Sequence, residues 1–165
     1  MKLKIFSAVV LLLVCIQFIH LQPNDSKDDT HAIWNTYQTP DRVKSHLQAA
    51  CLDCHSNFTR ETWYSNIQPL GFWLQNHVRE GKKHVNYSEF TNRPLARQYH
   101  KLEETIEMIN EGEMPLSSYT FFGLHSEANL TAENKKEIIH WAQSIMDTMK
   151  AHYPPDSFVM KKKKD

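Results

Sequence analysis

Apolar residues recur at intervals of three and four along most of the chain, the spacing that places them on one face of an α-helix. The longest stripe contains Leu95, Tyr99, Leu102, Ile106 and Ile109. Three shorter stripes contain Val43 with Leu47, Phe72 with Trp73 and His77, and Ile138, Trp141, Ile145 and Met149. These stripes predict helices over residues 39–50, 69–80, 94–111 and 132–151. No alternating apolar and polar run of useful length predicts a strand, so the expected fold class is all-α.

Residues with strong preferences for helix ends mark these boundaries. Thr39 and Thr131 stand where an N-cap is expected, and Pro40 suits the first helical position. Gly81 and Gly112 follow the second and third stripes, and glycine commonly ends a helix. We therefore expect the second helix to stop at Gly81 and the third to stop at Gly112.

A largely apolar run, "IFSAVVLLLVCIQFIHL", occupies residues 5–21. As a helix its 17 residues would extend about 26 Å, close to the roughly 30 Å hydrocarbon core of a membrane. A cleaved secretion signal is the alternative, but "FIHLQPND" lacks the small-residue exit site of such signals. We therefore expect an uncleaved transmembrane helix, and Lys2 and Lys4 place the rest of the chain outside a bacterial inner membrane.

Four segments are expected in all. The anchor at 1–21 is followed by a polar tether at 22–38, a helical domain at 39–153 and a basic tail at 154–165. The formal charge is zero, but without the lysines at the two ends residues 5–160 carry 13 basic and 18 acidic side chains, a net charge of −5. An acidic body disfavours nucleic-acid binding and favours a protein partner with a basic patch.

The stretch "ACLDCHSN" at 50–57 places Cys51, Cys54 and His55 in the order C-x-x-C-H. This spacing is the signature of covalent haem c attachment. Each thiol adds to one vinyl group of haem, and the histidine that follows binds the iron. The predicted helix over 39–50 leads directly into the first cysteine and would support the attachment.

Three other chemistries fit these residues less well. A structural zinc site needs four ligands, and the one remaining cysteine, Cys15, lies in the predicted anchor. A redox dithiol is expected next to a βαβ unit, which the helical pattern does not provide. A disulfide between Cys51 and Cys54 would leave His55 without a role. Haem c is therefore the expected cofactor.

Met114, in the loop sequence "GEMPL", is the expected second axial ligand of the iron. Its thioether is a soft ligand that raises a reduction potential, and Pro115 restricts the preceding backbone to an extended conformation. Histidines are the alternative ligands, namely His77, His84, His100 and His125. Around the cofactor we expect Trp63, Tyr64 and Trp73 to form a wall, and His77 to bind either the iron or a haem propionate.

With these features assembled, the chain resembles a family of small, membrane-anchored, cytochrome-c-like proteins that carry a haem-binding domain and are typical of Bacteroidetes-type bacteria. The resemblance covers about residues 10–150, in the segments "VCIQFIHLQPND", "CLDCHSNFTRETWYSNIQPLGFWLQNHV", "EGEMPLSSY" and "LTAENKKEIIHWA". It implies a cytochrome-c-like helical domain wrapped around one haem c. In that domain Cys51 and Cys54 attach the haem, and His55 and Met114 bind its iron.

The expected function is single-electron transfer by a monohaem cytochrome on the periplasmic side of the inner membrane, with a redox protein of the cell envelope as its partner. Such a carrier is not an enzyme and has no catalytic residues. A haem sensor or peroxidase-like enzyme with an exchangeable sixth ligand is the alternative, and a module that docks on another envelope protein is a third hypothesis.

Overall fold

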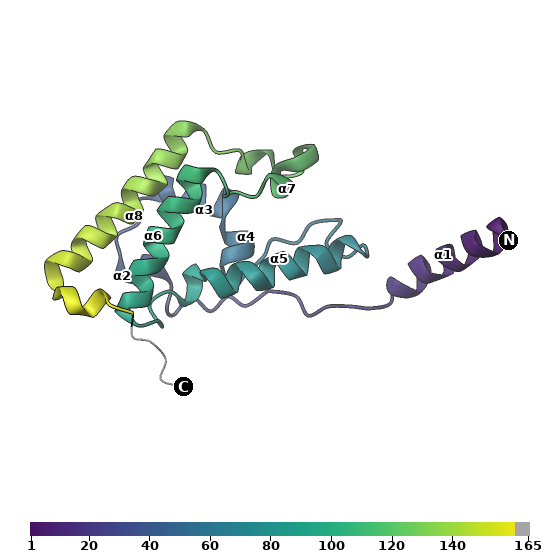
Figure 1. Ribbon diagram of the computed structural model, residues 1–165, viewed down its shortest axis with the longest axis horizontal. Helices are drawn as coiled ribbons and strands as arrows, with labels where there is room; N and C mark the ends of the chain where they lie inside the picture. Colours follow the sequence, from purple (N-terminus) through teal and green to yellow (C-terminus); the bar gives the residue numbers. More distant parts are fainter. Residues whose placement is uncertain (161–165) are drawn as a thin grey trace.

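The computed structural model describes residues 1–160, the side chain of Phe122 excepted, and these residues form helices and no strand. Figure 1 shows the arrangement. The α-helices are α1 (Lys2–Ile16), α2 (Ile33–Thr36), α3 (Asp41–Ala50), α4 (Leu52–His55), α5 (Leu70–His84), α6 (Leu95–Glu111), α7 (Ser117–Thr120) and α8 (Ala132–His152). Short 3₁₀ turns lie at Tyr87–Glu89, Phe121–Gly123, Ser126–Ala128 and Pro155–Phe158. The all-α prediction is confirmed.

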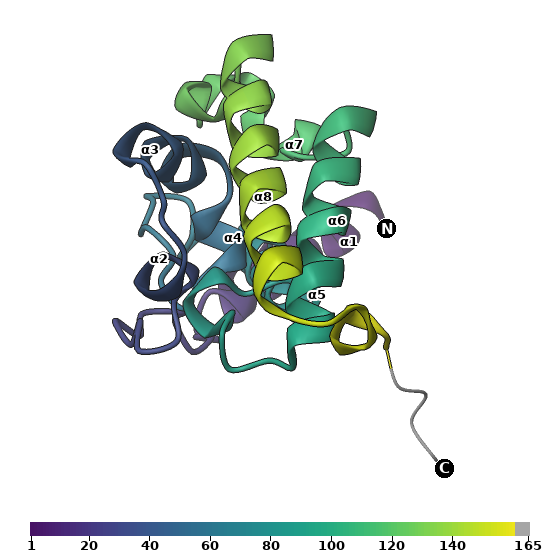
Figure 2. The ribbon, with the colours of Figure 1, turned by 90° about the vertical axis from the view of Figure 1, so that its left-hand side faces the viewer.

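Helices α3, α6 and α8 enclose the main core. Figure 2 shows α8 between α3 on one side and α6 on the other. The apolar stripes of these helices meet there, and the residues that they bury most completely are Leu47, Leu102, Ile138 and Met149. Burying an aliphatic side chain of this size contributes about 1.5–3 kcal/mol to folding, so these stripes determine how the three helices pack.

The helix ends agree with the sequence at most places. Gly112 has a φ of 76° and ends α6 in the left-handed conformation, and the Thr131 hydroxyl accepts a hydrogen bond from the Asn134 amide at the start of α8. The predicted start of the first helix is wrong by one residue, because α3 begins at Asp41 and its N-cap residue is Pro40. The Thr39 hydroxyl does not cap the helix and instead donates to the Tyr37 carbonyl at 3.1 Å.

The predicted stop at Gly81 is wrong, because α5 continues through this residue to His84. Gly81 serves packing instead. A Cβ atom built on it would lie 2.6 Å from the backbone carbonyl oxygen of Cys54. The glycine is therefore needed because α4 and α5 approach each other closely at this point.

Residues 24–37, within the segment that we expect to be a tether, lie against the helical domain. Ala32 and Ile33 are fully buried. The Asn24 side-chain amide donates hydrogen bonds to the Ser56 carbonyl and the Thr59 hydroxyl, at 3.0 and 2.9 Å. At the other end of the chain, Phe158 packs on Tyr99 with their ring centroids 4.8 Å apart. The basic lysines at 161–164 lie outside the described residues.

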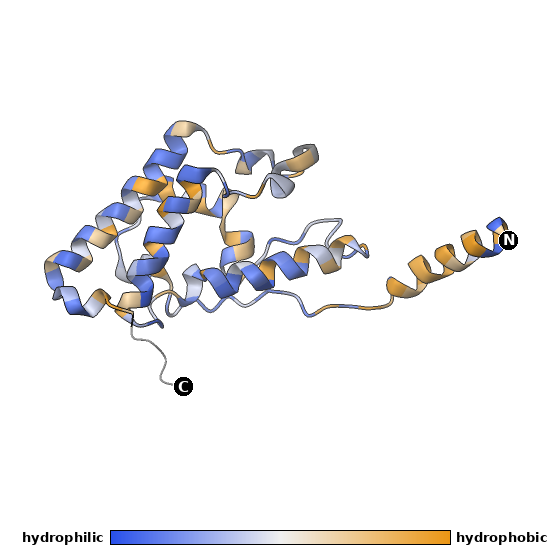
Figure 3. Cartoon of the chain, in the orientation of Figure 1, coloured by the Kyte–Doolittle hydropathy of each residue, from blue (hydrophilic) through white to orange (hydrophobic). Residues whose placement is uncertain are grey.

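The N-terminal helix is shorter than the transmembrane helix that the sequence predicts over residues 5–21. Helix α1 has 15 residues, and Gln17, which follows it, exchanges two hydrogen bonds with the backbone of Gln68. Figure 3 shows that most residues of α1 are hydrophobic, and the helix buries none of its residues. Among residues 1–160 no helix combines the length and the apolar composition needed to cross a membrane.

Candidate functional site

One turn of backbone brings the two thiols and the imidazole together. Helix α3 ends at Ala50, and the Cys51 amide still donates to the Leu47 carbonyl at 2.8 Å. The Cys51 carbonyl then accepts hydrogen bonds from the amides of Cys54 and His55, at 3.2 and 3.0 Å, and so starts α4. Local hydrogen bonds alone therefore place the C-x-x-C-H residues on a single helical turn.

Cys51 and Cys54 are both free thiols and do not form a disulfide. Burial, followed by the influence of Cys54, raises the pKa of Cys51 to about 12. Burial, followed by the charge of Asp53, raises the pKa of Cys54 to about 11. Both groups are therefore protonated at neutral pH. Residues 1–160 also contain no group of three or more His, Cys, Asp and Glu side chains placed to hold a metal ion.

The ring of His55 is held in one orientation. Its Nδ1 lies 3.0 Å from the Val85 carbonyl oxygen, which follows the end of α5. Burial lowers the pKa of His55, although the hydrogen bond to Val85 acts in the opposite direction. A neutral ring that donates from Nδ1 has its lone pair on Nε2. A backbone carbonyl at this position is the usual way in which proteins orient a metal-binding histidine.

Two adjoining cavities meet at this turn. The larger has a volume of about 420 Å³ and lies between the C-x-x-C-H turn, the end of α5 and α6. The smaller, of about 50 Å³, extends toward His77, Leu116 and Tyr119. Both are lined by Cys51, His55, Gly81 and Met114. The structure thus brings both predicted iron-binding side chains and an attaching thiol to one space, and the second thiol, on Cys54, lines the smaller cavity.

Met114 reaches this space from the loop after α6. Gly112 turns the chain away from the helix, and the Met114 amide donates a hydrogen bond to the Met108 carbonyl at 3.1 Å. Among the alternative ligands, His77 lines only the smaller cavity and His84 only the larger. His100 instead pairs with Glu104 on the surface of α6. Of the candidate ligands, it is therefore Met114, and none of the histidine alternatives, that lines both cavities together with His55.

The predicted aromatic wall is not gathered around the cavities. Trp63 is 73% exposed and Trp73 is 46% exposed, and neither they nor Tyr64 line either cavity. The Tyr64 hydroxyl is hydrogen-bonded to Nε2 of the buried His125. Trp73 packs against His77 with their ring centroids 4.3 Å apart. A contact of the three aromatic residues with haem stays a prediction.

A buried carboxylate beside the cysteines is a feature of the site that the sequence did not indicate. Asp53 is 6% exposed and forms hydrogen bonds with the guanidinium and the backbone amide of Arg60. Its carboxylate also accepts a hydrogen bond from the Tyr119 hydroxyl on α7. Because α7 follows the loop that carries Met114, Asp53 links the C-x-x-C-H turn to that loop. Its partner Tyr119 is 66 residues away, so no local pattern could have indicated the contact.

A comparison with protein families identifies the family to which the chain belongs. The family model described as haem-binding domain matches residues 11–144. The chain belongs to the haem-binding-domain family. Neither the curated proteins nor the solved structures provide a match. Haem binding is thereby established for this chain as a property of its family.

The site of this haem-binding domain has the donors that haem requires. Protonated thiols, a neutral imidazole and a thioether face one space. The cavity volume of about 420 Å³ lies within the usual range of pockets for cofactors and ligands. Apolar or partly apolar side chains contribute to its lining, among them Val85, Tyr87, Met108 and Ile109. The residues that are present therefore fit a haem group.

Proposed function

We propose that this haem-binding domain holds haem c covalently and acts as a single-electron carrier with a cytochrome-c-like arrangement. The observation that carries the proposal is that His55 and Met114 line the same two cavities as Cys51. Each of Cys51 and Cys54 would add its sulfur and its proton across one vinyl double bond of haem, which forms a thioether and needs no oxidant. Both thiols are protonated and supply that hydrogen themselves.

His55 and Met114 are the two side chains that would bind the iron. The Val85 carbonyl accepts a hydrogen bond from Nδ1 of His55, which leaves the lone pair of Nε2 as the one that would bind the iron. The Met114 sulfur, a soft donor, would raise the reduction potential. When bound, haem c supplies an iron that gains or loses one electron. Because the chain itself would supply two iron-binding side chains, His55 and Met114, we propose a carrier and not an enzyme.

The N-terminal helix supports a location at the cell envelope. Helix α1 exposes Leu3, Phe6 and Leu11, with exposed fractions of 76%, 66% and 63%. We propose that this apolar surface keeps the chain at the inner membrane with its haem domain in the periplasm, beside a redox protein partner. Cell fractionation of a tagged full-length chain tests the location, and recovery of the protein in the cytoplasmic fraction would contradict it.

The ligand assignment is tested by a pair of matched variants in the haem-loaded, full-length protein. Met114→Leu should lose the near-infrared band of sulfur-to-iron charge transfer in the ferric spectrum and should lower the reduction potential. Met108→Leu is the control, because Met108 lines the same cavity from α6. A charge-transfer band that persists in Met114→Leu would show that another side chain binds the iron. A high-spin ferric spectrum in the unaltered protein would instead favour an exchangeable sixth ligand.

A further inference from the structure

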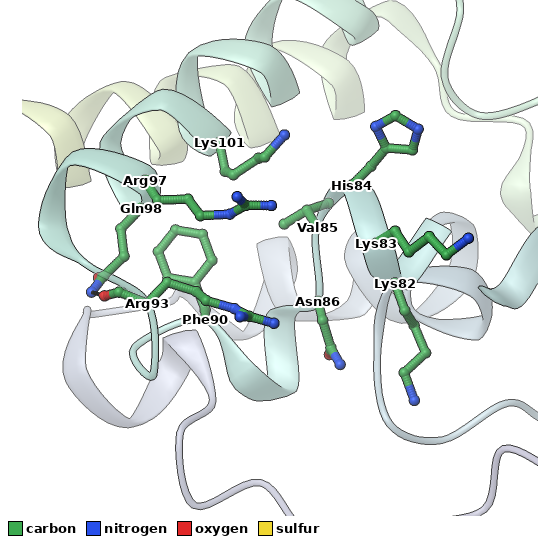
Figure 4. Close-up of a pocket in the computed structure, with 10 residues that line it drawn as sticks. All are labelled: Lys82, Lys83, His84, Val85, Asn86, Phe90, Arg93, Arg97, Gln98 and Lys101. Carbon is green, nitrogen blue, oxygen red and sulfur yellow. Dashed lines mark hydrogen bonds between the residues drawn. The ribbon is translucent and has the colours of Figure 1, made fainter. Parts of the chain in front are cut away.

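A cleft lined by basic side chains lies where the end of α5 faces the start of α6. Figure 4 shows the ten residues that line it, namely Lys82, Lys83, His84, Val85, Asn86, Phe90, Arg93, Arg97, Gln98 and Lys101. Five are lysine or arginine, one is histidine and none is acidic. In Figure 4 the side chains of Arg93, in the turn before α6, and Arg97, on α6, extend toward Asn86 and Val85, whereas Lys82 and Lys83 point away from this gap.

The charge of the cleft is opposite to that of the rest of the domain. Residues 82–101 contain five lysines and arginines and one acidic residue, Glu89, which gives a net charge of +4. The remainder of residues 5–160 contains eight basic and seventeen acidic side chains, which gives −9. The mildly acidic total that the sequence shows thus conceals two regions of opposite sign, and the basic region surrounds the cleft.

Two of the basic side chains are available for an outside partner. Lys83 pairs with Glu80 at 2.8 Å, Lys101 pairs with Glu104, and Lys82 donates to the Asn24 side chain. Arg93 and Arg97, by contrast, have no ion pair with any described residue of the chain. A guanidinium is a planar, permanently charged donor that matches a carboxylate in two parallel hydrogen bonds. The cleft therefore offers two unpaired groups of the type that recognises acidic side chains.

The cleft also adjoins the candidate haem site. His84, Val85 and Lys101 line both the cleft and the larger cavity. A protein bound at the cleft would therefore sit at the rim of the cavity that holds His55 and Met114. Electron transfer between proteins requires such closeness to the redox centre, and opposite charge at the contact accelerates the encounter.

We propose that this cleft is the docking surface for an acidic patch on the redox partner, with Arg93 and Arg97 as the main contacts. The inference rests on the proposed function as an electron carrier. It also specifies the partner, because the cleft that the partner would meet is basic although the domain as a whole is acidic.

The test compares oxidants of opposite charge on the reduced, haem-loaded, full-length protein. Ferricyanide is the anionic probe and tris(phenanthroline)cobalt(III) is the cationic probe, both followed by stopped-flow absorbance at about 10 mM ionic strength, where the Debye length is about 30 Å. In the double variant Arg93→Gln/Arg97→Gln, oxidation by ferricyanide should be about tenfold slower than in the unaltered protein. Oxidation by the cobalt complex should be unchanged or faster. Arg79→Gln is the matched control, because Arg79 is an exposed arginine of α5 that does not line the cleft.

An acidic polypeptide extends the test from a small anion to a protein-like partner. Poly-L-glutamate should slow the oxidation of the unaltered protein and of Arg79→Gln by ferricyanide, but should not slow that of the double variant. Equal ferricyanide rates in the double variant and the unaltered protein would overturn the proposal. So would a reduction potential that shifts enough in the double variant to account for its rate, because the arginines would then act on the haem itself. If neither oxidant oxidises the reduced protein, the proposed electron carrier fails and not only the docking surface.

Discussion

Substitution of Gly81 by alanine tests the close contact that holds the candidate site together. The new Cβ would lie 2.6 Å from the Cys54 carbonyl oxygen and 3.2 Å from both the carbonyl carbon and the Cβ atom of Cys54. Ordinary contact begins at 3.4 Å, so the two helices must separate by about 0.8 Å. These atoms belong to the backbone of α4 or are fixed directly to it, so no side-chain rotation relieves the contact.

Two opposing effects determine how much Gly81→Ala changes the free energy of unfolding. At an open helical position, replacing glycine with alanine stabilises a protein by about 1 kcal/mol. Overpacking against fixed atoms costs about 1–3 kcal/mol, and contact with backbone atoms places this case near the upper end. We expect Gly81→Ala to lower the free energy of unfolding by about 2 kcal/mol. The shift also draws Val85 away from His55, so the variant should carry less covalently attached haem.

Urea unfolding of the haem-loaded protein provides the assay, together with the haem-to-protein ratio of the purified variant. Asn76→Ala is the control for alanine in α5, because Asn76 is exposed on the same helix, and this variant should be unchanged or slightly more stable. A Gly81→Ala protein that is more stable than the unaltered protein and binds haem normally would refute the close approach of α4 and α5.

Three further predictions concern other parts of the structure, and urea unfolding of the full-length, haem-loaded protein measures each of them. Tyr119→Phe removes the hydrogen bond to the buried Asp53 carboxylate and should cost about 1–2 kcal/mol; an unchanged midpoint would mean that this bond does not tie α7 to α4. Ile33→Ala should cost about 2–4 kcal/mol because Ile33 is fully buried, whereas a freely moving tether at 22–38 would leave the stability unaltered. Thr131→Ala should cost about 1 kcal/mol through loss of the N-cap of α8, and Thr131→Ser should restore most of it.

The parts of the fold that depend on local sequence could be predicted. Helices α3, α6 and α8 carry regular apolar stripes, and their ends at Gly112 and Thr131 follow from conformational preferences that act within a few residues. The C-x-x-C-H turn is equally local, because backbone hydrogen bonds within residues 47–55 form it.

The parts that depend on distant contacts could not be predicted. A glycine that ends a helix and a glycine that permits close packing look alike in one sequence, so the sequence cannot show that α5 continues through Gly81. The link from Asp53 to Tyr119 joins residues far apart in the chain. The basic cleft arises because the turn at 85–94 brings the end of α5 opposite the start of α6. The basic residues at 82–101 can be counted in the sequence, but only the fold shows that they line one cleft.

The proposed function depends first on the covalent attachment of one haem by Cys51 and Cys54. The most direct measurement is the mass of the denatured protein after expression together with a cytochrome c maturation system. We predict a mass greater by one haem, with haem absorbance that stays with the polypeptide under denaturing conditions, and a loss of both in Cys51→Ala/Cys54→Ala. A protein of unmodified mass that releases its haem on denaturation would contradict covalent attachment. A double variant that retains covalent haem would show that Cys51 and Cys54 are not the attachment residues.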